Sequence, residues 1–496
     1  MIKPTGFLAL LLIAIVECLN SSAQRLVLPG DHPDPSIVKI GNTYWASATT
    51  SNWMPAYPLL KSDDMVNWTT QGYVFNKLPE WADYYFWAPE ISYENGKVYV
   101  YYAAHKKGGN LCLGVATANK PEGPYKDSGP LMCEEAGSID AFPMRDENGK
   151  LYLIWKEDAN SVKKPTPIWA MEMIEDRSAL VGEKHELFRN KIAWEENLVE
   201  GVSMMKHNGY FYAFYAAAGC CGAGCSYVVG IARSKNLLGP WEKDPANPVL
   251  KSNEEWICPG HGTPIEKDGR YYFLHHAYDK ITNAFTGRQG LLSEFKFTDD
   301  GWVKFVNIPE PIATPAPVTD NFDGRNLSLN WQWSVFQRDI KYKVKKGHLL
   351  LTATDVPAGA FIGQKILSGD FEATASLIIK GTKSNAGIAA IGDDKNTLSL
   401  LYSDDTVRLV KLKDDSTTTL ASLPVVAKQF VNFKMQALGG RYYTFSIATD
   451  GGPFTTINSK PVDGLFLPPW DRGIRAGLVA KGSGKAKFDF FEMISK

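Results

Sequence analysis

The hydrophobic pattern of the first 300 residues is a repeated phrase: a glycine, two further residues, a tyrosine and then an apolar or aromatic run. Its copies begin at Gly41, Gly96, Gly149, Gly209 and Gly269, so the period is 53 to 60 residues. A repeat of this length with several strands in each unit is typical of a β-propeller. Because a polar turn precedes each glycine, each phrase is predicted to be the second strand of a hairpin. Five copies predict five blades.

A different pattern follows Trp302. The segment 312–320, within NIPEPIATPAPVTD, is rich in proline and is predicted to be an extended linker. From Asn321 onward, short alternating strands such as HLLLTAT and TLSLLYS are separated by polar turns, which is typical of an antiparallel β-sandwich. We therefore predict an all-β chain, with a five-bladed β-propeller over 24–311 and a sandwich over 321–496.

The first residues, 1–23, resemble a secretory signal peptide. Lys3 precedes an apolar run over 7–16, and small residues at 21–23 form a cleavage site. The run has about ten residues, which is too short to cross a bilayer. We therefore expect export to the periplasm or the extracellular space with no membrane anchor.

Composition narrows the class of partner. The chain has 496 residues, 44% of them hydrophobic, which suits folded domains with sizeable cores. The formal net charge of −1 argues against nucleic acid or an anionic membrane as partner. The 14 Trp and 22 Tyr residues suit a protein that presents aromatic faces to a neutral polar ligand such as a sugar.

Six cysteines remain after the predicted cleavage: Cys112, Cys133, Cys220, Cys221, Cys225 and Cys258. An even number in an exported chain permits disulfides, but the sequence does not choose among the possible connectivities. The cluster GCCGAGCS lacks the C-x2-C pairs of structural zinc sites and has no histidine close by. We therefore expect a loop held by oxidised cysteines there rather than a zinc site.

An ionisable residue stands a few positions before each repeated glycine, at the start of the preceding strand. These five residues are Asp34, Glu90, Asp140, Glu200 and His261. In a propeller the first strand of every blade lines the central channel, so the five side chains are expected to converge near one mouth. A structural protein gains nothing from the repulsion and desolvation that four gathered carboxylates cost. The set therefore predicts a functional site.

The motifs that carry these residues, each in its own blade and in this order, resemble those of glycoside hydrolase family 43. They are HPDPSI, WAPEI, SIDAFPMRDENGKLYL, VEGVSMMKHNGYFYAFY and GHGTPI. The resemblance covers Leu28 to about Pro311, and NFDGRNLSLNWQW resembles the concanavalin-like sandwich of the β-xylosidase and α-L-arabinofuranosidase branch. It implies an inverting glycosidase that requires no cofactor and releases terminal α-L-arabinofuranosyl or β-D-xylosyl units from plant polysaccharides or their oligomers.

Carried across residue by residue, the resemblance implies a role for each position. The general base matches Asp34, the auxiliary aspartate matches Asp140 and the general acid matches Glu200. Arg288 in TGRQGLL matches an arginine that neighbours the base. His261 matches an axial histidine that in some members touches water or a bound divalent cation such as calcium. Where many β-xylosidases have EGPH this chain has EGVS, so the wall beside the acid differs.

These roles agree with what hydrolysis with inversion needs. A protonated acid serves the leaving oxygen while an ionised base holds water on the opposite face of the sugar, about 6.5–9.5 Å away. Asp140, as a nearby negative charge, is expected to favour the protonated form of Glu200. Arg288 is expected to hold Asp34 ionised.

Several alternatives stay open. Trp87 either offers a ring face to the sugar or fills the space between blades, and His261 either meets the axial ligand or is a hydrogen-bonded core residue. For Glu90 a structural role is favoured over catalysis. Two other functions are a catalytically silent carbohydrate-binding propeller and an endo-arabinanase. The intact trio of carboxylates argues against the first, and the appended sandwich argues against the second.

Overall fold

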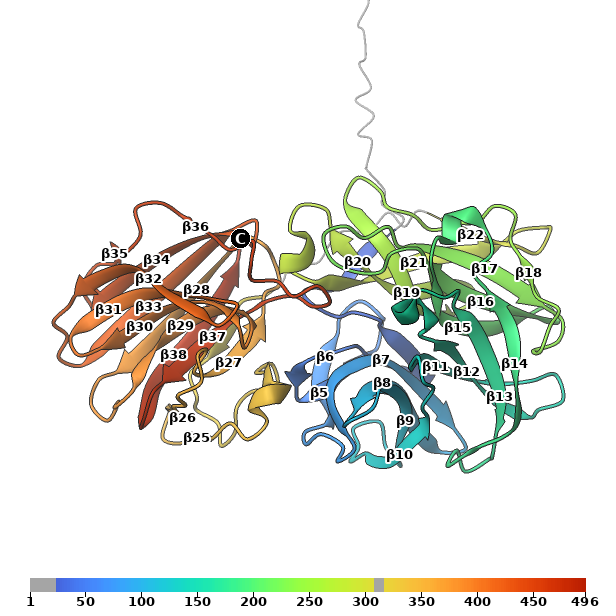
Figure 1. The fold of residues 1–496 in the computed structure, drawn as a ribbon, viewed down its shortest axis with the longest axis horizontal. Coiled ribbons are helices and arrows are strands. Elements are labelled where there is room, and N and C mark those ends of the chain that lie inside the picture. Colours follow the sequence, from blue (N-terminus) through green and yellow to red (C-terminus); the bar gives the residue numbers. More distant parts are fainter. Residues whose placement is uncertain (1–23, 307–315) are drawn as a thin grey trace, which may run out of the picture.

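The computed structural model describes residues 24–306 and 316–496, which form two β regions side by side (Figure 1). The predicted signal peptide and residues 312–315 of the predicted linker lie outside the described residues. The predicted all-β class is confirmed, since the helical segments of the described chain are short 3-10 turns. Their bounds are Ala159–Val162 (η1), Ala193–Glu195 (η2), Asn283–Phe285 (η3) and Val335–Gln337 (η4). Within the two described ranges, no helix is long and apolar enough to span a bilayer.

Residues 24–306 form five separate antiparallel sheets, drawn in blue to yellow-green in Figure 1. The first contains β2 (Ser36–Ile40), β3 (Thr43–Ser47), β5 (Ala56–Ser62) and β6 (Thr69–Phe75). The second contains β7 (Ala82–Glu94), β8 (Lys97–Lys106), β9 (Leu111–Ala118) and β10 (Lys126–Met132). The third contains β11 (Ser138–Arg145), β12 (Leu151–Glu157), β13 (Pro167–Met173) and β14 (Leu180–Arg189).

The remaining two sheets complete this region. The fourth contains β15 (Val199–His207), β16 (Tyr210–Ala217), β17 (Val228–Ser234) and β18 (Glu242–Lys243). The fifth contains β19 (Trp256–Lys267), β20 (Arg270–Asp279), β21 (Arg288–Phe297), β22 (Val303–Val306) and β1 (Arg25–Leu28).

The repeated glycine phrase is the second strand of a hairpin in every sheet, as the sequence predicts. The hairpins are β2–β3, β7–β8, β11–β12, β15–β16 and β19–β20. The repeated glycines have φ angles from 62° to 87°, which glycine adopts without steric cost. The repeated tyrosines are all buried, so each phrase supplies both the turn and part of the core.

The first strands of the five sheets surround a common axis. β2 contacts β7, β7 contacts β11, β11 contacts β15, and β15 contacts β19, which contacts β2 in turn. The N-terminal β1 pairs with β21 of the last sheet, so the two ends of the region share one sheet. This closes the ring and places the beginning of every first strand at the same end of the axis.

Residues 316–496 form a sandwich of two sheets, drawn in yellow to red in Figure 1. The larger sheet contains β23 (Val318–Asp320), β25 (Tyr342–Val344), β26 (Leu349–Thr352), β28 (Phe371–Ile378), β33 (Phe430–Leu438), β34 (Tyr442–Thr449), β35 (Thr455–Thr456), β36 (Val462–Asp463) and β38 (Lys485–Ser495). The smaller sheet contains β27 (Ala360–Lys365), β29 (Asn385–Asp393), β30 (Asn396–Ser403), β31 (Thr406–Lys413), β32 (Ser416–Pro424) and β37 (Arg475–Lys481).

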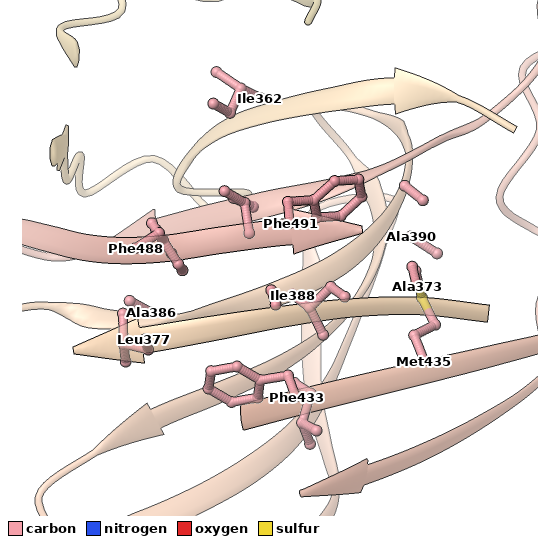
Figure 2. Close-up of a cluster of buried hydrophobic side chains, with 14 of the residues drawn as sticks. Ile362, Ala373, Leu377, Ala386, Ile388, Ala390, Phe433, Met435, Phe488 and Phe491 are labelled. Atoms are coloured by element: carbon pink, nitrogen blue, oxygen red, sulfur yellow. The ribbon is translucent and has the colours of Figure 1, made fainter. Parts of the chain in front are cut away.

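The two sheets of the sandwich enclose a large apolar core. Ile362 and Ile388 of the smaller sheet are buried together with Phe433, Phe488 and Phe491 of the larger one (Figure 2). Along strands such as β28 and β33, buried side chains alternate with partly exposed ones. The prediction of a sandwich rests on this pattern.

One predicted boundary is wrong by three residues. Val318–Asp320 belongs to the predicted linker, but it forms β23 and pairs with β38 near the C-terminus. A three-residue strand has too little alternation to be recognised from the sequence, and its pairing partner lies at the far end of the chain.

The two regions are joined by strand pairing as well as by side chains. β24 (Trp333–Ser334) of the second region pairs with β4 (Trp53–Met54) of the first. Arg475 is fully buried and forms an ion pair with Asp31 at 3.1 Å between Nη1 and Oδ2. The sandwich is therefore docked on the propeller, and its loops are held near the propeller axis.

Candidate active site

One pocket lies where the first strands of the five sheets meet. It is lined by six residues singled out from the sequence: Asp34, Trp87, Asp140, Glu200, His261 and Arg288. Its volume of about 160 Å³ is below the roughly 300–1,000 Å³ of sites for drug-sized ligands. The pocket therefore suits one small group such as a single sugar.

The site residues stand at irregular points of the inner strands. The pairing register is interrupted after Ile139 in β11, after Glu200 in β15 and on both sides of Gly260 in β19. Asp34 and Asp140 have φ angles of 50° and 60°, which residues other than glycine rarely adopt. Bulges and such backbone outliers re-aim side chains and concentrate at active sites. The local backbone thus turns these carboxylates towards the pocket.

Asp34, directly before β2, is a buried carboxylate with a fixed cation. Arg288 Nη1 donates to Asp34 Oδ1 at 2.9 Å, and Thr49 Oγ1 donates to Oδ2 at 2.6 Å. Burial alone would raise the pKa of Asp34, but the charge of Arg288 and the contact with His261 outweigh it and hold the pKa well below its usual range. This carboxylate is therefore ionised and able to accept a proton.

Glu200 in β15 has a donor on each carboxylate oxygen. Lys156 Nζ donates to Oε2 at 2.5 Å, and Tyr227 OH donates to Oε1 at 2.8 Å. Lys156 also contacts Asp158 Oδ1 at 2.9 Å, and its side chain is 1% exposed. Burial would lower the pKa of Lys156, but the charges of Glu200 and Asp158 raise it above its ordinary value. The orientation of the Glu200 carboxyl is therefore set before any ligand binds.

Asp140 in β11 is attached to the backbone beside Glu200. The N–H of Gly201 donates to Asp140 Oδ2 at 2.8 Å. Burial, with the charge of Glu200 adding to it, raises the pKa of Asp140 to about 6. Asp140 therefore takes up a proton near pH 6, whereas Asp34 stays ionised there.

His261 in β19 lies between the two aspartates. Its Nδ1 is 3.5 Å from Asp34 Oδ1 and 3.9 Å from Asp140 Oδ1. Burial would lower the pKa of His261, but the charge of Asp140 and the contact with Asp34 raise it to about 9, so the ring is a charged donor.

The expected role of His261 as an axial ligand of a metal ion or water stays a prediction. In the part of the chain that the structure describes, no group of three or more His, Cys, Asp or Glu side chains is placed to hold a metal ion.

Glu90 departs from the expected convergence, because it does not line the pocket. Its Oε2 accepts a hydrogen bond from Thr263 Oγ1 of β19 at 2.9 Å. Burial raises the pKa of Glu90 to about 8, so the group is neutral at pH 7. Its side chain connects two inner strands, in keeping with the structural role that the sequence favours, and the expectation that all five ionisable side chains meet at one mouth is wrong for this residue.

The sandwich contributes one wall of the pocket through Trp470 and Asp471. Arg288 Nη2 donates to the backbone oxygen of Asp471 at 3.1 Å, and the Asp471 carboxylate accepts a hydrogen bond from Ser51 Oγ. The ring of Trp470 meets that of Trp87 edge to face, with centroids 5.8 Å apart. The arginine that holds Asp34 is thus itself held by the second domain.

The cysteine cluster forms another wall. Cys220 and Cys221 are joined in a disulfide and both line the pocket, and Arg288 Nη1 lies 3.8 Å from Cys220 Sγ. A second disulfide joins Cys225 to Cys258 in β19. The third joins Cys112 to Cys133 in the second sheet. The expectation of a loop held by oxidised cysteines is therefore confirmed, and the pairing that the sequence left open is resolved.

Sequence reasoning missed several polar residues of the site. Lys156 carries a recognisable signal, because it is a cation at the end of the apolar run LYLIW in one of the repeated phrases. Tyr227 and Asp471 carry none, since nothing in the cysteine cluster before Tyr227 or in the sandwich loop around Asp471 marks these side chains for the pocket. Their roles depend on chain segments that only the fold brings to the pocket.

Comparisons with known proteins agree with this geometry. Residues 23–303 match the family model of glycosyl hydrolases family 43, and residues 319–494 match that of the β-xylosidase C-terminal concanavalin A-like domain. The chain is 26% identical to a non-reducing end α-L-arabinofuranosidase of Bacteroides ovatus, over 99% of both chains. It is 29% identical to a putative β-xylosidase of Xylanibacter ruminicola, over 72% of this chain and 70% of that one. A solved family 43 protein of Bacillus licheniformis shares the fold at a TM-score of 0.81 and 23% identity, covering 95% of this chain and 100% of that one.

Proposed function

The chain belongs to glycosyl hydrolases family 43, and on this premise we propose that it releases terminal α-L-arabinofuranosyl or β-D-xylosyl units from plant polysaccharides or their oligomers. It is an inverting glycosidase. The observation that carries the proposal is a single pocket that holds a carboxylate kept ionised by an arginine and a second carboxylate beside a buried aspartate.

Asp34 is the general base of this proposal. It takes a proton from the water that attacks the anomeric carbon, and the low pKa caused by Arg288 keeps it ready to do so. The hydrogen bonds from Arg288 and Thr49 occupy one side of each oxygen, which fixes the direction from which water is held.

Glu200 is the general acid, and it gives its proton to the glycosidic oxygen as the bond to the anomeric carbon breaks. Lys156 and Tyr227 orient its carboxyl group. Asp140 lies in the same corner of the pocket, where the Gly201 N–H holds its carboxyl group, and it modulates the acid from there. The surroundings of the three carboxyl groups, rather than their residue types, therefore give each one its role.

The shape of the pocket supports removal of a terminal sugar. Trp470 and Asp471 of the sandwich line the pocket and close part of its rim, and the cavity is small. The names of the relatives include both α-L-arabinofuranosidase and β-xylosidase, which supports the two sugars without separating them. Trp87 offers its partly exposed ring to the bound sugar in this proposal.

The test is to incubate pure protein with p-nitrophenyl α-L-arabinofuranoside and p-nitrophenyl β-D-xyloside side by side. We expect nitrophenol release from at least one of them, and any product released from linear arabinan should be arabinose rather than oligomers. Inactivity on both aryl glycosides would favour a silent carbohydrate-binding propeller. Oligomeric products from arabinan would favour an endo-arabinanase.

We also propose export, with the signal peptide removed after residue 23. Three disulfides among the described residues support an oxidising compartment, because disulfides are rare in the cytosol. Sequencing of the mature N-terminus from the secreting cell tests this, and a retained N-terminal segment would contradict it.

A further inference from the structure

A stripe of aromatic side chains leads from the active-site pocket to a second cavity on the sandwich. Trp470 and Trp87 stand at the pocket, and Trp87 stacks on Tyr85 with ring centroids 4.5 Å apart. Tyr85 contacts Tyr84 at 4.7 Å, and Tyr84 contacts Phe336 at 6.0 Å. Phe336 lines the second cavity. Each ring thus touches the next along a continuous path.

The rings of the stripe are accessible to solvent. Trp470 is 54% exposed and Phe336 is 58% exposed, while Tyr84, Tyr85 and Trp87 are partly exposed. Exposing several neighbouring aromatic rings to water costs free energy, and a surface without a binding role gains nothing in return. Contiguous exposed aromatic surface usually marks a binding site.

The backbone of β7 is irregular where it carries the stripe. Side chains of a regular strand alternate between faces, so Tyr84 and Tyr85 would point to opposite sides. Instead the register is interrupted between Ala82 and Tyr84 and again between Tyr84 and Trp87. Tyr85 has a φ of 55°, a strained angle for a bulky residue, and its N–H donates to Asn52 Oδ1 at 2.9 Å. Such strain persists where a side chain is needed in one place.

The second cavity has the composition of a sugar site. Its volume is about 340 Å³, and apolar Phe336, Ile340 and Val356 line it together with polar and charged residues, which are Gln337, Arg338, Asp339, Lys341, Thr352 and Thr354. A pocket of apolar faces with a few polar groups suits a neutral polyhydroxylated ligand. The ring contacts therefore run from the catalytic pocket to this cavity.

We propose that the stripe from Trp470 to Phe336 binds the sugar chain that follows the cleaved bond. The ligand is a neutral plant oligosaccharide or polysaccharide, whose sugar units lie on the rings beyond the pocket while its terminal unit occupies the pocket. This inference rests on the proposed function, since it extends the same site along the leaving-group side of the substrate. It makes the enzyme more effective on long chains than on small glycosides.

The test compares Phe336→Ala and Tyr84→Ala with the wild type on an aryl glycoside and on an arabinoxylan oligosaccharide. Loss of one aromatic contact is expected to lower kcat/KM for the oligosaccharide about two- to ten-fold and to leave that for the aryl glycoside unchanged. Phe454→Ala is the matched control, because Phe454 is 43% exposed and lies beside β35 at the far edge of the sandwich (Figure 1). An equal loss on both substrates, or no loss on the oligosaccharide, would overturn the proposal.

Affinity electrophoresis gives a readout that does not depend on catalysis. Native gels containing arabinoxylan, arabinan or xyloglucan should retard the wild type and the Phe454→Ala variant in at least one case, and retard Phe336→Ala less. Equal mobility of all variants in every gel would contradict the proposal that the stripe binds sugar chains. Retardation of a protein that cleaves no aryl glycoside would instead refute the proposed function while supporting the stripe.

Discussion

The two halves of this molecule are both built from antiparallel sheets, yet they bury opposite chemistry. Around the propeller axis, Asp34, Asp140, Glu200 and Lys156 are each less than a tenth exposed. The interior of the sandwich, around Phe433, contains hydrocarbon and aromatic side chains. Face-to-face sheets bring side chains into one continuous contact, where an unpaired charge would be prohibitively costly. A ring of sheets instead brings strand ends together at an axis, where polar groups can pair with one another and still reach solvent.

The comparison implies that chemistry and stability are separable in this chain. Substitutions at the axis are expected to change mainly the rate, and substitutions in the sandwich core are expected to change mainly the free energy of unfolding. The docked loop carrying Trp470 and Asp471 is where the two overlap, because it belongs to the sandwich but lines the pocket.

The largest expected effect is on the rate at the axis. Glu200→Ala should lower the rate on a natural oligosaccharide by about 10²–10⁴, the contribution of one positioned proton donor. The loss should be smaller on a nitrophenyl glycoside, because nitrophenol leaves with little protonation. Asp34→Ala should damage both substrates, since water must be activated whatever group leaves. Measured kcat values for both variants on both substrates decide this, and an equal loss factor for Glu200→Ala on the two would refute its role as acid.

A truncation in the sandwich core is expected to have the opposite effect, lowering stability and not the activity of the folded molecule. Phe433→Ala should lower the free energy of unfolding by about 3–5 kcal/mol, because it leaves a cavity among fully buried side chains. Denaturant titration measures this loss, and Phe454→Ala on the surface should change it by less than about 0.5 kcal/mol. Activity per folded molecule on an aryl glycoside should be unchanged at a temperature where the variant is folded. A large fall in that activity would show that the sandwich interior acts on the pocket, and the separation would fail.

A smaller effect is expected from Asp140→Asn, which keeps an oxygen for the Gly201 N–H but removes a charge. The pKa of Asp140 is raised to about 6, so above that pH Asp140 adds a negative charge beside the proposed acid. Removing this charge lessens the repulsion that opposes loss of the catalytic proton, and the upper limb of the pH–rate profile should move to lower pH. A profile of kcat/KM on one aryl substrate provides the check. A limb that stayed in place or moved to higher pH would contradict the role given to Asp140.

Much of the architecture could be predicted because its determinants are local and repeated. The glycine phrases specify hairpins, since glycine at positive φ closes the turn and the tyrosine three residues later is buried. The same repetition indicated that Asp34, Asp140, Glu200 and His261 occupy equivalent places in different sheets. Glu90 obeyed the same spacing but pairs with Thr263 instead, because spacing specifies the start of a strand and not the direction of a side chain.

The sequence by itself therefore determined the all-β class, the repeated hairpins and the carboxylates that line the pocket, and it indicated a change of domain near residue 320. Only the tertiary structure decided how those carboxylates are charged and enclosed. Arg288 meets the backbone of Asp471 across 183 residues, and Lys156 meets Glu200 from the neighbouring sheet. The pairing of the six cysteines and the aromatic stripe were decided in the same way. Such contacts depend on how separate sheets pack. The residue pattern within one strand does not indicate which distant side chain will form an ion pair with a given charge or pack against a given aromatic ring.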